Sequence, residues 1–298
     1  MASSIKQPLA EVFGFPNNDL SDQAERYRRL KLCPYNNRVP SCTKDKANDP
    51  LGVCSIYHDK VELNEPIITC PIRFRQDWII AEDAARFFFN DETSWTSLSE
   101  VKLRDKNGQS AGNIDLVLVA YDEQGRVVDF GSLEIQAVYI SGNVRRPFEY
   151  YMLDRENRQN MDWGQLATYY PRPDYLSSSR KRLVPQMLYK GGILKEWHKK
   201  QAVAIQRSFY ETLPQLPEVS REEAEIAWFL YDLEQVDNRF HLTLSQTIYT
   251  EFWPAINTIT TPIAGDVVNF VEILQNKLDE KQDGNPPDAP TITDLVLS

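Results

Sequence analysis

The chain has 298 residues, of which 42% are hydrophobic and 26% are charged, as is usual for a folded globular protein of one or two domains. Its formal net charge of −10 argues weakly against a nucleic-acid ligand, because phosphate backbones attract basic surfaces. No apolar run approaches the roughly 20 residues that span a bilayer, and the opening residues MASSIKQPLAEVF lack the apolar core of a signal peptide. We therefore expect a cytoplasmic protein with no membrane partner.

Residues 1–75 are predicted to be a loop-rich first domain. A short basic helix is predicted at 21–31, after an irregular start. Residues 33–75 hold all four cysteines among Pro, Asn, Asp and Lys, with little periodicity. Such a segment buries little apolar surface by itself. The cysteines are Cys33, Cys42, Cys54 and Cys70.

Four thiolates in one polar, turn-rich segment suit a tetrahedral metal site that holds together a segment with little core. Disulfides are not expected, because cytoplasmic cysteines are normally reduced. The alternative is four unrelated buried thiols, since free cysteine is often buried. The absence of any other cysteine and the polar surroundings favour the metal. The site would be structural, because all four ligands are protein groups, and composition does not separate iron from zinc.

Residues 76–275 are predicted to form a mixed α/β core, and residues 276–298 a flexible tail. Periodicity, turn residues and cap residues predict the elements of the core. They are a helix at 77–89, a strand at 99–105, two strands within 112–143 joined by a turn at Asp122–Arg126, a helix at 186–213 interrupted at Gly191-Gly192, a helix at 220–235 with a Ser-x-x-Glu start, a strand at 240–250 and a helix at 265–281.

The strand pair within 112–143 carries unexpected polar residues. Asp115 stands among apolar residues of the first strand, and Glu134 and Gln136 share one face of the second. With the turn at 122–126, Asp115 falls opposite about residue 132, on that same face. Two carboxylates so placed suit Mg²⁺, which prefers carboxylate oxygens. The alternative is that Asp115 caps a strand and Glu134 pairs with a basic residue.

The charge is unevenly distributed along the chain. From Arg172 to Arg207 there are nine basic residues and only two acidic ones, whereas in Glu211–Asp237 Arg221 is the one basic residue among many acidic ones. Such asymmetry marks either a nucleic-acid face on an acidic molecule or a solvated helix face, and the pattern alone does not decide between them.

The order Asp115, Glu134, Gln136 resembles the PD-(D/E)xK nuclease core, in which Asp and Glu bind the metal and a Lys occupies the third position. Here the Lys is replaced by Gln. Together with the cysteine segment LCPYNNRVPSCTKDKANDPLGVCSIYHDK…ITCPIRFRQDWII and with KRLVPQMLYKGGILKEWHKKQAVAIQRSFYETLP, the hairpin resembles the NotI-type restriction endonucleases over roughly residues 33–217. That family is similar in using Glu-x-Gln.

The resemblance implies a bacterial type II restriction endonuclease of the restriction-endonuclease-like fold, with a mixed central sheet flanked by helices and a small four-cysteine module. It implies a homodimer that cuts palindromic double-stranded DNA. The four cysteines would hold one iron, with zinc as second choice. Asp115 and Glu134 would hold Mg²⁺, and Gln136 would take the place of the lysine. Glu82, in the preceding helix, is a further acidic candidate by analogy with related nuclease cores.

Six basic residues are candidates for DNA contact. Arg145 and Arg146 follow the catalytic strand and are expected to read bases or to lie beside the scissile phosphate, since Arg commonly reads guanine. The alternative is a surface pair that balances Glu149 and Asp154. Phosphate contacts are assigned to the remaining four, Arg180, Lys181, Arg182 and Lys190.

Two other functions remain open from the sequence. One is a metal-stapled DNA-binding protein without cleavage, which would have no reason to keep Asp115 and Glu134 together. The other is a repair- or RNA-directed nuclease on the same core, which substrate preference would distinguish. The sequence gives neither the recognition site nor the residues that read it, because both depend on a few loop side chains and on DNA deformation.

Overall fold

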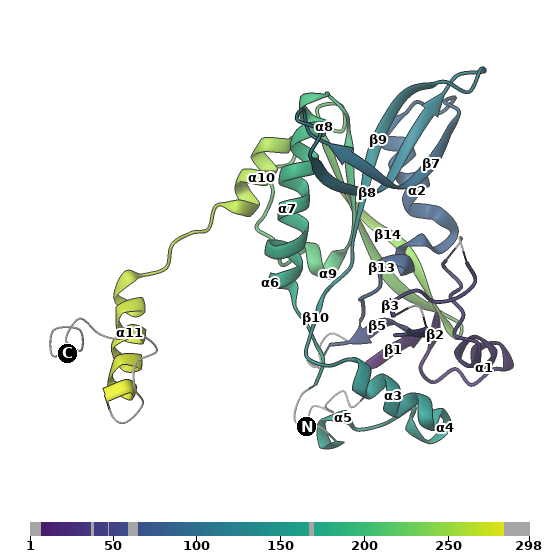
Figure 1. Cartoon of the computed structure of the whole chain (residues 1–298), viewed down its shortest axis with the longest axis vertical. Helices are drawn as coiled ribbons and strands as arrows, with labels where there is room; N and C mark the ends of the chain where they lie inside the picture. The colour runs from purple at the N-terminus through teal and green to yellow at the C-terminus, as the bar shows by residue number, and fades with distance from the viewer. Residues whose placement is uncertain (1–6, 37–38, 47, 59–64, 167–169, 283–298) are drawn as a thin grey trace. The chain divides into compact units, whose positions relative to one another are not determined.

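A computed structural model describes residues 7–36, 39–46, 48–58, 65–166 and 170–282 (Figure 1). Backbone contacts divide the chain into two units, Met1–Thr260 and Thr261–Ser298. The first contains every sheet of the described residues. The second contains α11 (Val267–Gln282), which agrees with the helix predicted at 265–281. Residues 283–298 of the predicted tail lie outside the described residues. The predicted boundaries at 75/76 and 275/276 stay predictions.

The central sheet has six strands in the order β14-β13-β12-β9-β8-β7. Strand β12 is parallel to both of its neighbours, and the other pairs are antiparallel, so the sheet is mixed. The predicted mixed α/β fold with helices flanking a central sheet is therefore confirmed. The strands are β7 (Trp95–Arg104), β8 (Ser110–Tyr121), β9 (Val127–Gln136), β12 (Gln201–Gln206), β13 (Ile226–Val236) and β14 (Arg239–Thr250).

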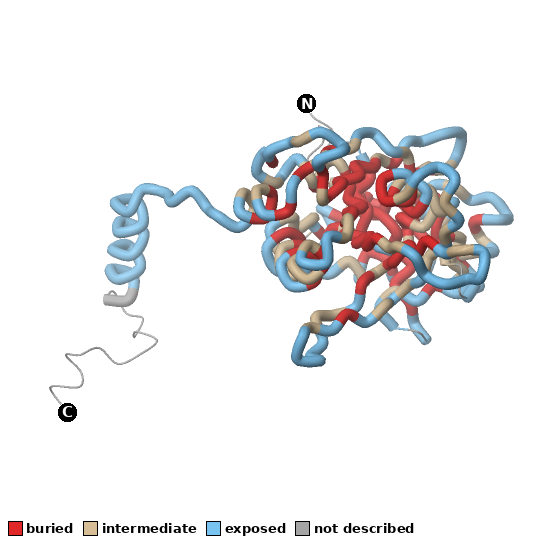
Figure 2. Tube along the Cα trace, turned by 90° about the horizontal axis from the view of Figure 1, so that it is seen from above, coloured by how far each residue is buried: buried red, intermediate tan, exposed pale blue. Residues whose placement is uncertain are grey.

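Helices cover both faces of this sheet. Because side chains alternate along a strand, Ala202 and Ala204 of β12 face α2 (Ile79–Phe88), whereas Val203 and Ile205 face the opposite helices. Figure 2 shows the buried residues concentrated in this central part. The opposite helices are α6 (Tyr175–Ser178), η2 (Ser179–Leu183), α7 (Val184–Gln186), η3 (Met187–Gly191), α8 (Gly192–Glu196) and α10 (Phe252–Thr260).

The N-terminal segment is more regular than predicted. It forms a four-stranded sheet in the order β2-β1-β5-β6, and its apolar residues belong to the same core cluster as Val203 and Trp228 of the central sheet. The N-terminal segment therefore packs into the same hydrophobic core as the central sheet and does not rely on a separate core of its own. Its elements are β1 (Leu9–Val12), β2 (Phe15–Pro16), α1 (Asp22–Arg29), β3 (Asp45–Lys46), β4 (Asp49–Pro50), β5 (Val53–Tyr57), β6 (Pro66–Ile68) and η1 (Pro71–Trp78).

Short elements lie between the strands β9, β12 and β13 of the central sheet. Strands β10 and β11 pair with each other, and α3 places Phe148 and Tyr151 in the shared core. No helix of the described residues is long and apolar enough to cross a membrane. The connecting elements are β10 (Ile140–Ser141), α3 (Arg145–Leu153), α4 (Arg155–Arg158), α5 (Trp163–Leu166), β11 (Arg172–Pro173) and α9 (Arg207–Tyr210).

Two helix predictions were wrong. The helix predicted at 186–213 ends at Glu196, and strand β12 follows it; the segment predicted as a helix at 220–235 contains strand β13. Both strands lie inside the sheet, and β12 and the first six residues of β13 are buried on both faces, so these sequences show no polar alternation. Ser220 does hydrogen-bond to Glu223, with Oγ to Oε2 at 2.8 Å, but the contact closes a turn.

A buried ion pair ties the N-terminal sheet to the central one. Arg73, three residues after Cys70, donates from Nε to Glu11 Oε1 at 3.0 Å, and neither side chain is exposed. Its Nη2 donates to the carbonyl oxygen of Phe240 in β14 at 2.8 Å, and its guanidinium lies 4.3 Å from the ring centre of Tyr35. Arg73 therefore contacts β1 of the N-terminal sheet through Glu11 and β14 of the central sheet through Phe240.

Candidate active site

The β8–β9 hairpin brings Asp115 and Glu134 together where its two strands part. The turn is at Asp122–Arg126, as predicted. An irregularity between Ala120 and Tyr121 shifts the register, so that Leu116 pairs with Leu133 and the ladder ends there. Asp115 consequently meets Glu134, and the predicted partner near 132 was wrong. Asp115 Oδ2 accepts a hydrogen bond from the Ile135 backbone N–H at 2.8 Å, in place of a carbonyl oxygen of the β-ladder.

Glu134 is 6% exposed, and its surroundings shift its pKa in two opposite directions. Burial, and then the negative charge of Asp115, raise its pKa to about 7, while the Lys190 ammonium acts in the other direction. Lys190 Nζ donates to Glu134 Oε2 at 2.6 Å. The second oxygen, Oε1, is buried with no hydrogen-bond partner in the described residues. Burial also raises the pKa of Asp115. The pair is thus held in an environment that disfavours two negative charges.

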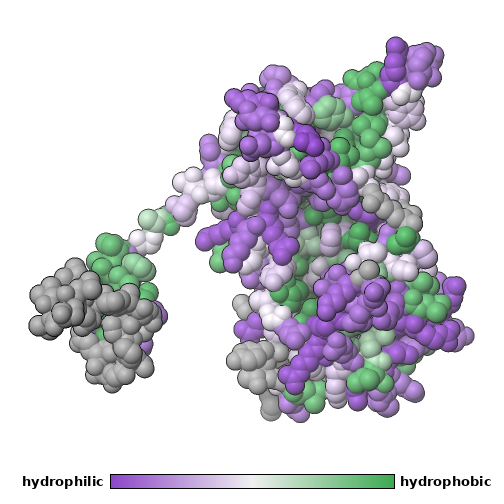
Figure 3. Space-filling model, viewed as in Figure 1, coloured by the Kyte–Doolittle hydropathy of each residue, from purple (hydrophilic) through white to green (hydrophobic). Residues whose placement is uncertain are grey.

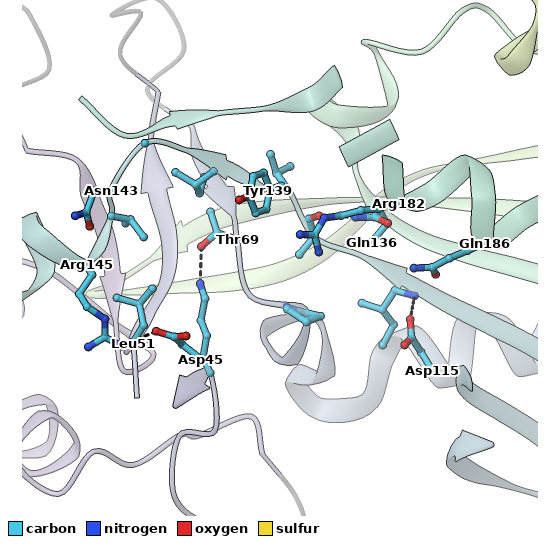
Figure 4. Close-up of a pocket in the computed structure, with 18 residues that line it drawn as sticks. Asp45, Leu51, Thr69, Asp115, Gln136, Tyr139, Asn143, Arg145, Arg182 and Gln186 are labelled. Carbon is cyan, nitrogen blue, oxygen red and sulfur yellow. Dashed lines mark hydrogen bonds and ion pairs between the residues drawn. The ribbon is translucent and has the colours of Figure 1, made fainter. Parts of the chain in front are cut away.

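A cavity of about 720 Å³ opens beside Asp115. Asp115, Gln136 and Gln186 line one end, and Asp45 and Arg145 line the other (Figure 4). The N-terminal segment and the central sheet therefore share one cavity. Figure 3 shows the surface hollowed between the helices and the N-terminal segment, with hydrophilic residues at its rims.

Gln136 lies at the cavity but is 7% exposed, and its Nε2 donates to the Ala137 carbonyl oxygen at 2.7 Å. Glu82 is not brought to this site. It lies on the exposed side of α2, pairs with Arg86 at 3.5 Å, and lines a different, smaller pocket.

Two charged residues near Asp115 were missed by the sequence analysis. The negative charge of Glu100 in β7 raises the pKa of Asp115, and the positive charge of Arg75 in η1 lowers it. Glu100 has a φ of 58° at an interruption of the β7–β8 pairing, and Arg75 Nε is buried with no acceptor placed in the described residues. Neither residue stands in a local pattern that would have revealed it.

Some of the residues predicted to contact DNA are exposed, whereas Arg145 forms ion pairs within the protein. Arg146 and the run Arg180–Lys181–Arg182 are exposed, and Arg182 lines the cavity with its guanidinium 4.5 Å from the ring centre of Tyr139. Arg145 instead donates to Asp45 Oδ2 at 2.6 Å and Asp49 Oδ2 at 2.7 Å. It therefore fastens the cysteine segment to α3 in this structure.

Much of the basic stretch 172–207 is neutralised internally. Besides Lys190 with Glu134, Lys199 pairs with Asp129 at 2.6 Å, Arg207 pairs with Asp232 at 2.7 Å, and Lys195 pairs with Glu225. The stretch is thus not one continuous basic face.

The four cysteines are free thiols gathered in the N-terminal segment. Burial raises the pKa of Cys33 to about 11, and negative charge on Cys70 and Cys42 acts in the same direction. Burial and the other three thiols likewise raise the pKa of Cys54. Negative charge on one thiol thus disfavours negative charge on the others, an effect that a cation among them would relieve.

Backbone donors point at two of the sulfurs. Cys33 lies within hydrogen-bonding reach of the N–H groups of Tyr35 and Asn36, and Cys42 of that of Lys44. Such hydrogen bonds favour the thiolate form that binds metals. In the described residues as placed, no group of three or more Cys, His, Asp or Glu side chains is close enough to hold a metal ion.

Two carboxylates on neighbouring strands, at the edge of a cavity that carries basic side chains, are typical of nucleases that hydrolyse phosphodiesters. The chain belongs to the NotI restriction endonuclease family, because the family model described as "Restriction endonuclease NotI" matches residues 18–244. It is therefore a type II site-specific deoxyribonuclease, a hydrolase that acts on DNA. No curated protein sequence matches the chain.

The raised pKa of Glu134 predicts how the stability of the metal-free protein depends on pH. A carboxyl whose pKa is raised on folding binds its proton more tightly in the folded state. Its contribution to stability therefore falls as the pH rises from 4.5 toward about 7. Asp115 is the second cause of the shift, after burial, so Asp115→Asn should flatten this fall. We expect the variant to gain about 1–3 kcal/mol relative to wild type between pH 5 and pH 7.

Urea unfolding in EDTA at several pH values measures this difference. Asp91→Asn is the matched control, because Asp91 is an exposed aspartate of the same sheet region. Parallel stability curves for Asp115→Asn and wild type would show that the two carboxyls do not interact.

Proposed function

We propose that this endonuclease is a PD-(D/E)xK enzyme of the Glu-x-Gln type that cleaves double-stranded DNA with Mg²⁺. One observation carries the proposal: the half-buried carboxyl group of Asp115, which lines the cavity, meets the buried carboxyl group of Glu134, and Glu134 Oε1 has no partner in the described residues. Carboxylate oxygens are the ligands that Mg²⁺ prefers, and a cation relieves the repulsion between them. The donor set thus fits Mg²⁺, with Asp115 and Glu134 holding it.

Bound Mg²⁺ would supply Lewis acidity toward the scissile phosphate and toward water. The chain's own groups prepare the site for it. The Ile135 N–H fixes the carboxylate of Asp115, and Lys190 fixes one oxygen of Glu134. In the proposed reaction water attacks phosphorus, the bond to the 3′ oxygen breaks, and a 5′-phosphate remains. Positioning of the carboxylates by rigid strands makes the site preorganised for that charge development.

We further propose that Cys33, Cys42, Cys54 and Cys70 hold one structural iron, with zinc as the second choice. Support comes from the mutual electrostatic effect of the four thiols and from the N–H groups directed at Cys33 and Cys42. A soft, fourfold thiolate set suits either metal. Bound metal would hold together the loop that carries Asp45 and Asp49 to Arg145.

A homodimer is part of the proposal. Each chain has one pair of catalytic carboxylates, so cutting both strands of a palindrome requires two chains related by a two-fold axis. The exposed run Arg180–Lys181–Arg182 is assigned to the DNA backbone, and Arg146 to DNA near the cut, because both remain accessible. A bacterial cytoplasmic location fits a restriction enzyme.

The carboxylates are tested by substitution. Asp115→Ala and Glu134→Ala should each lower the rate of DNA cleavage in Mg²⁺ by roughly 10³-fold or more, since Lewis acidity is worth several kcal/mol. DNA binding in Ca²⁺ should largely persist. Glu123→Gln, at the exposed tip of the same hairpin, is the matched control. Undiminished cleavage of plasmid or genomic DNA by either alanine variant would place the active site elsewhere.

The metal module is tested by elemental analysis. Protein produced without added metal should contain one iron, or one zinc, per chain. Cys54→Ser should lose it and unfold at lower temperature, because metal binding contributes to the folding of such a segment. Thiolate-to-iron absorption would identify iron. A metal-free preparation with the same melting temperature would contradict the proposal.

The basic run is tested by salt titration. Neutralising Arg180, Lys181 and Arg182 together should weaken binding to all sequences and lower the slope of log affinity against log salt by up to about three, roughly one for each lost phosphate contact. Binding is measured in Ca²⁺ on specific and random duplexes, with the exposed Lys106→Gln as control. An unchanged slope would mean that the run is only a solvated helix face.

A further inference from the structure

Lys190 comes from a helical turn whose position is tightly fixed. It lies in η3, a π-helical turn of a kind often found at functional sites. A Cβ on the next residue, Gly191, would lie only 2.7 Å from Gln201 Oε1 and from a ring carbon of Phe252. Gln201 also donates from Nε2 to the Gly191 carbonyl oxygen at 3.0 Å. The turn therefore packs directly on β12, next to the catalytic strand β9.

The ammonium of Lys190 is fully engaged at the catalytic hairpin. Its side chain crosses Gly112, where a Cβ would lie 3.6 Å from Lys190 Cδ. Nζ donates to Glu134 Oε2 at 2.6 Å, to the Asn113 carbonyl oxygen at 2.8 Å and to Gln186 Oε1 at 3.2 Å. These three acceptors match its three N–H donors. At 5% exposure the residue is not placed as a surface contact for DNA phosphates, the role predicted from the sequence.

Lys190 offsets part of the negative charge at this site. Asp115 and Glu134 are both acidic, and Gln136, where the related motif has lysine, is neutral with its amide turned to Ala137. In the described part of the chain, Lys190 is the cation that hydrogen-bonds to the carboxylate pair. Its hydrogen-bond partner Gln186 lines the cavity, as Asp115 does, so the buried ammonium lies directly behind residues of the cavity's catalytic end.

We propose that Lys190 supplies the positive charge that Gln136 does not, so that the lysine of the Glu-x-Lys motif has moved from the catalytic strand to the helix packed on it. The inference rests on the proposed function of Asp115 and Glu134. A pair with only a structural role would leave no reason for Glu134 Oε1 to stay buried without a partner next to Asp115, which lines the cavity. The role of Lys190 is to position Glu134 and to neutralise charge at the reaction centre.

The test moves the positive charge from position 190 to position 136, where the Glu-x-Lys motif has its lysine. Lys190→Gln should slow single-turnover cleavage in Mg²⁺ by about 10²-fold or more, at unchanged DNA affinity in Ca²⁺. The double variant Gln136→Lys/Lys190→Gln should recover at least about tenfold of that loss, and Lys190→Arg should retain part of the activity. The substrate is a natural DNA that the wild type cuts, at saturating enzyme. Lys195→Gln, which breaks the ion pair with Glu225 farther along the same helical run, is the matched control.

The outcomes separate the possibilities. Cleavage by Lys190→Gln within about threefold of wild type would overturn the proposal, since an electrostatic contribution of this kind is worth far more. So would a folded, DNA-binding double variant that is no faster than Lys190→Gln. If Lys190→Gln fails to fold, the cleavage rates of Lys190→Arg and of the double variant are compared with that of wild type. Both variants keep a cation at the site, so activity in either would support the proposal and inactivity of both would overturn it. Full activity of Asp115→Asn would instead reject the proposed active site itself.

Discussion

The contact between the carboxyl groups of Asp115 and Glu134 constrains this end of the sheet. Two like charges out of water are costly, so each carboxylate needs a compensating donor. The β8–β9 ladder stops after Leu116 and Leu133, which frees the Ile135 N–H for Asp115. Strand β9 continues beside β12 instead, and the helical run over β12 delivers Lys190 to Glu134. The strand separation, the parallel pairing and the π-helical turn are thus parts of one arrangement.

The ion pair of Glu11 and Arg73 fixes the N-terminal segment in place, as the contacts around Asp115 and Glu134 fix the active site. Both side chains are fully buried, so removal of one partner alone would cost about 3–5 kcal/mol. Arg73 follows Cys70 closely and also binds the backbone of β14 at Phe240. The cysteine segment is therefore anchored to the central sheet independently of any metal. Since both parts line the cavity, this anchor also preserves the cavity's shape.

The sequence predicted the elements whose signals are local. The β8–β9 hairpin was found because turn residues and alternation coincide at Asp122–Arg126, and α2 because its apolar face recurs at helical spacing. Strands β12 and β13 were missed because burial on both faces removes alternation. The shared face of Asp115 and Glu134 followed from the hairpin, but their direct contact depends on the register shift between Ala120 and Tyr121. The contact between Lys190 and Glu134, 56 residues apart, and the distance of Glu82 from the site depend on tertiary packing, which leaves no mark in a local pattern.

The internal pairing of basic residues explains how an acidic protein presents a surface to DNA. Of the nine basic residues from Arg172 to Arg207, four are matched by Glu134, Asp129, Glu225 and Asp232. What remains exposed is concentrated in Arg180–Lys181–Arg182, of which Arg182 lines the cavity. With this run assigned to the DNA backbone, as proposed, DNA would approach the molecule beside the cavity, and the net charge of −10 would not prevent binding.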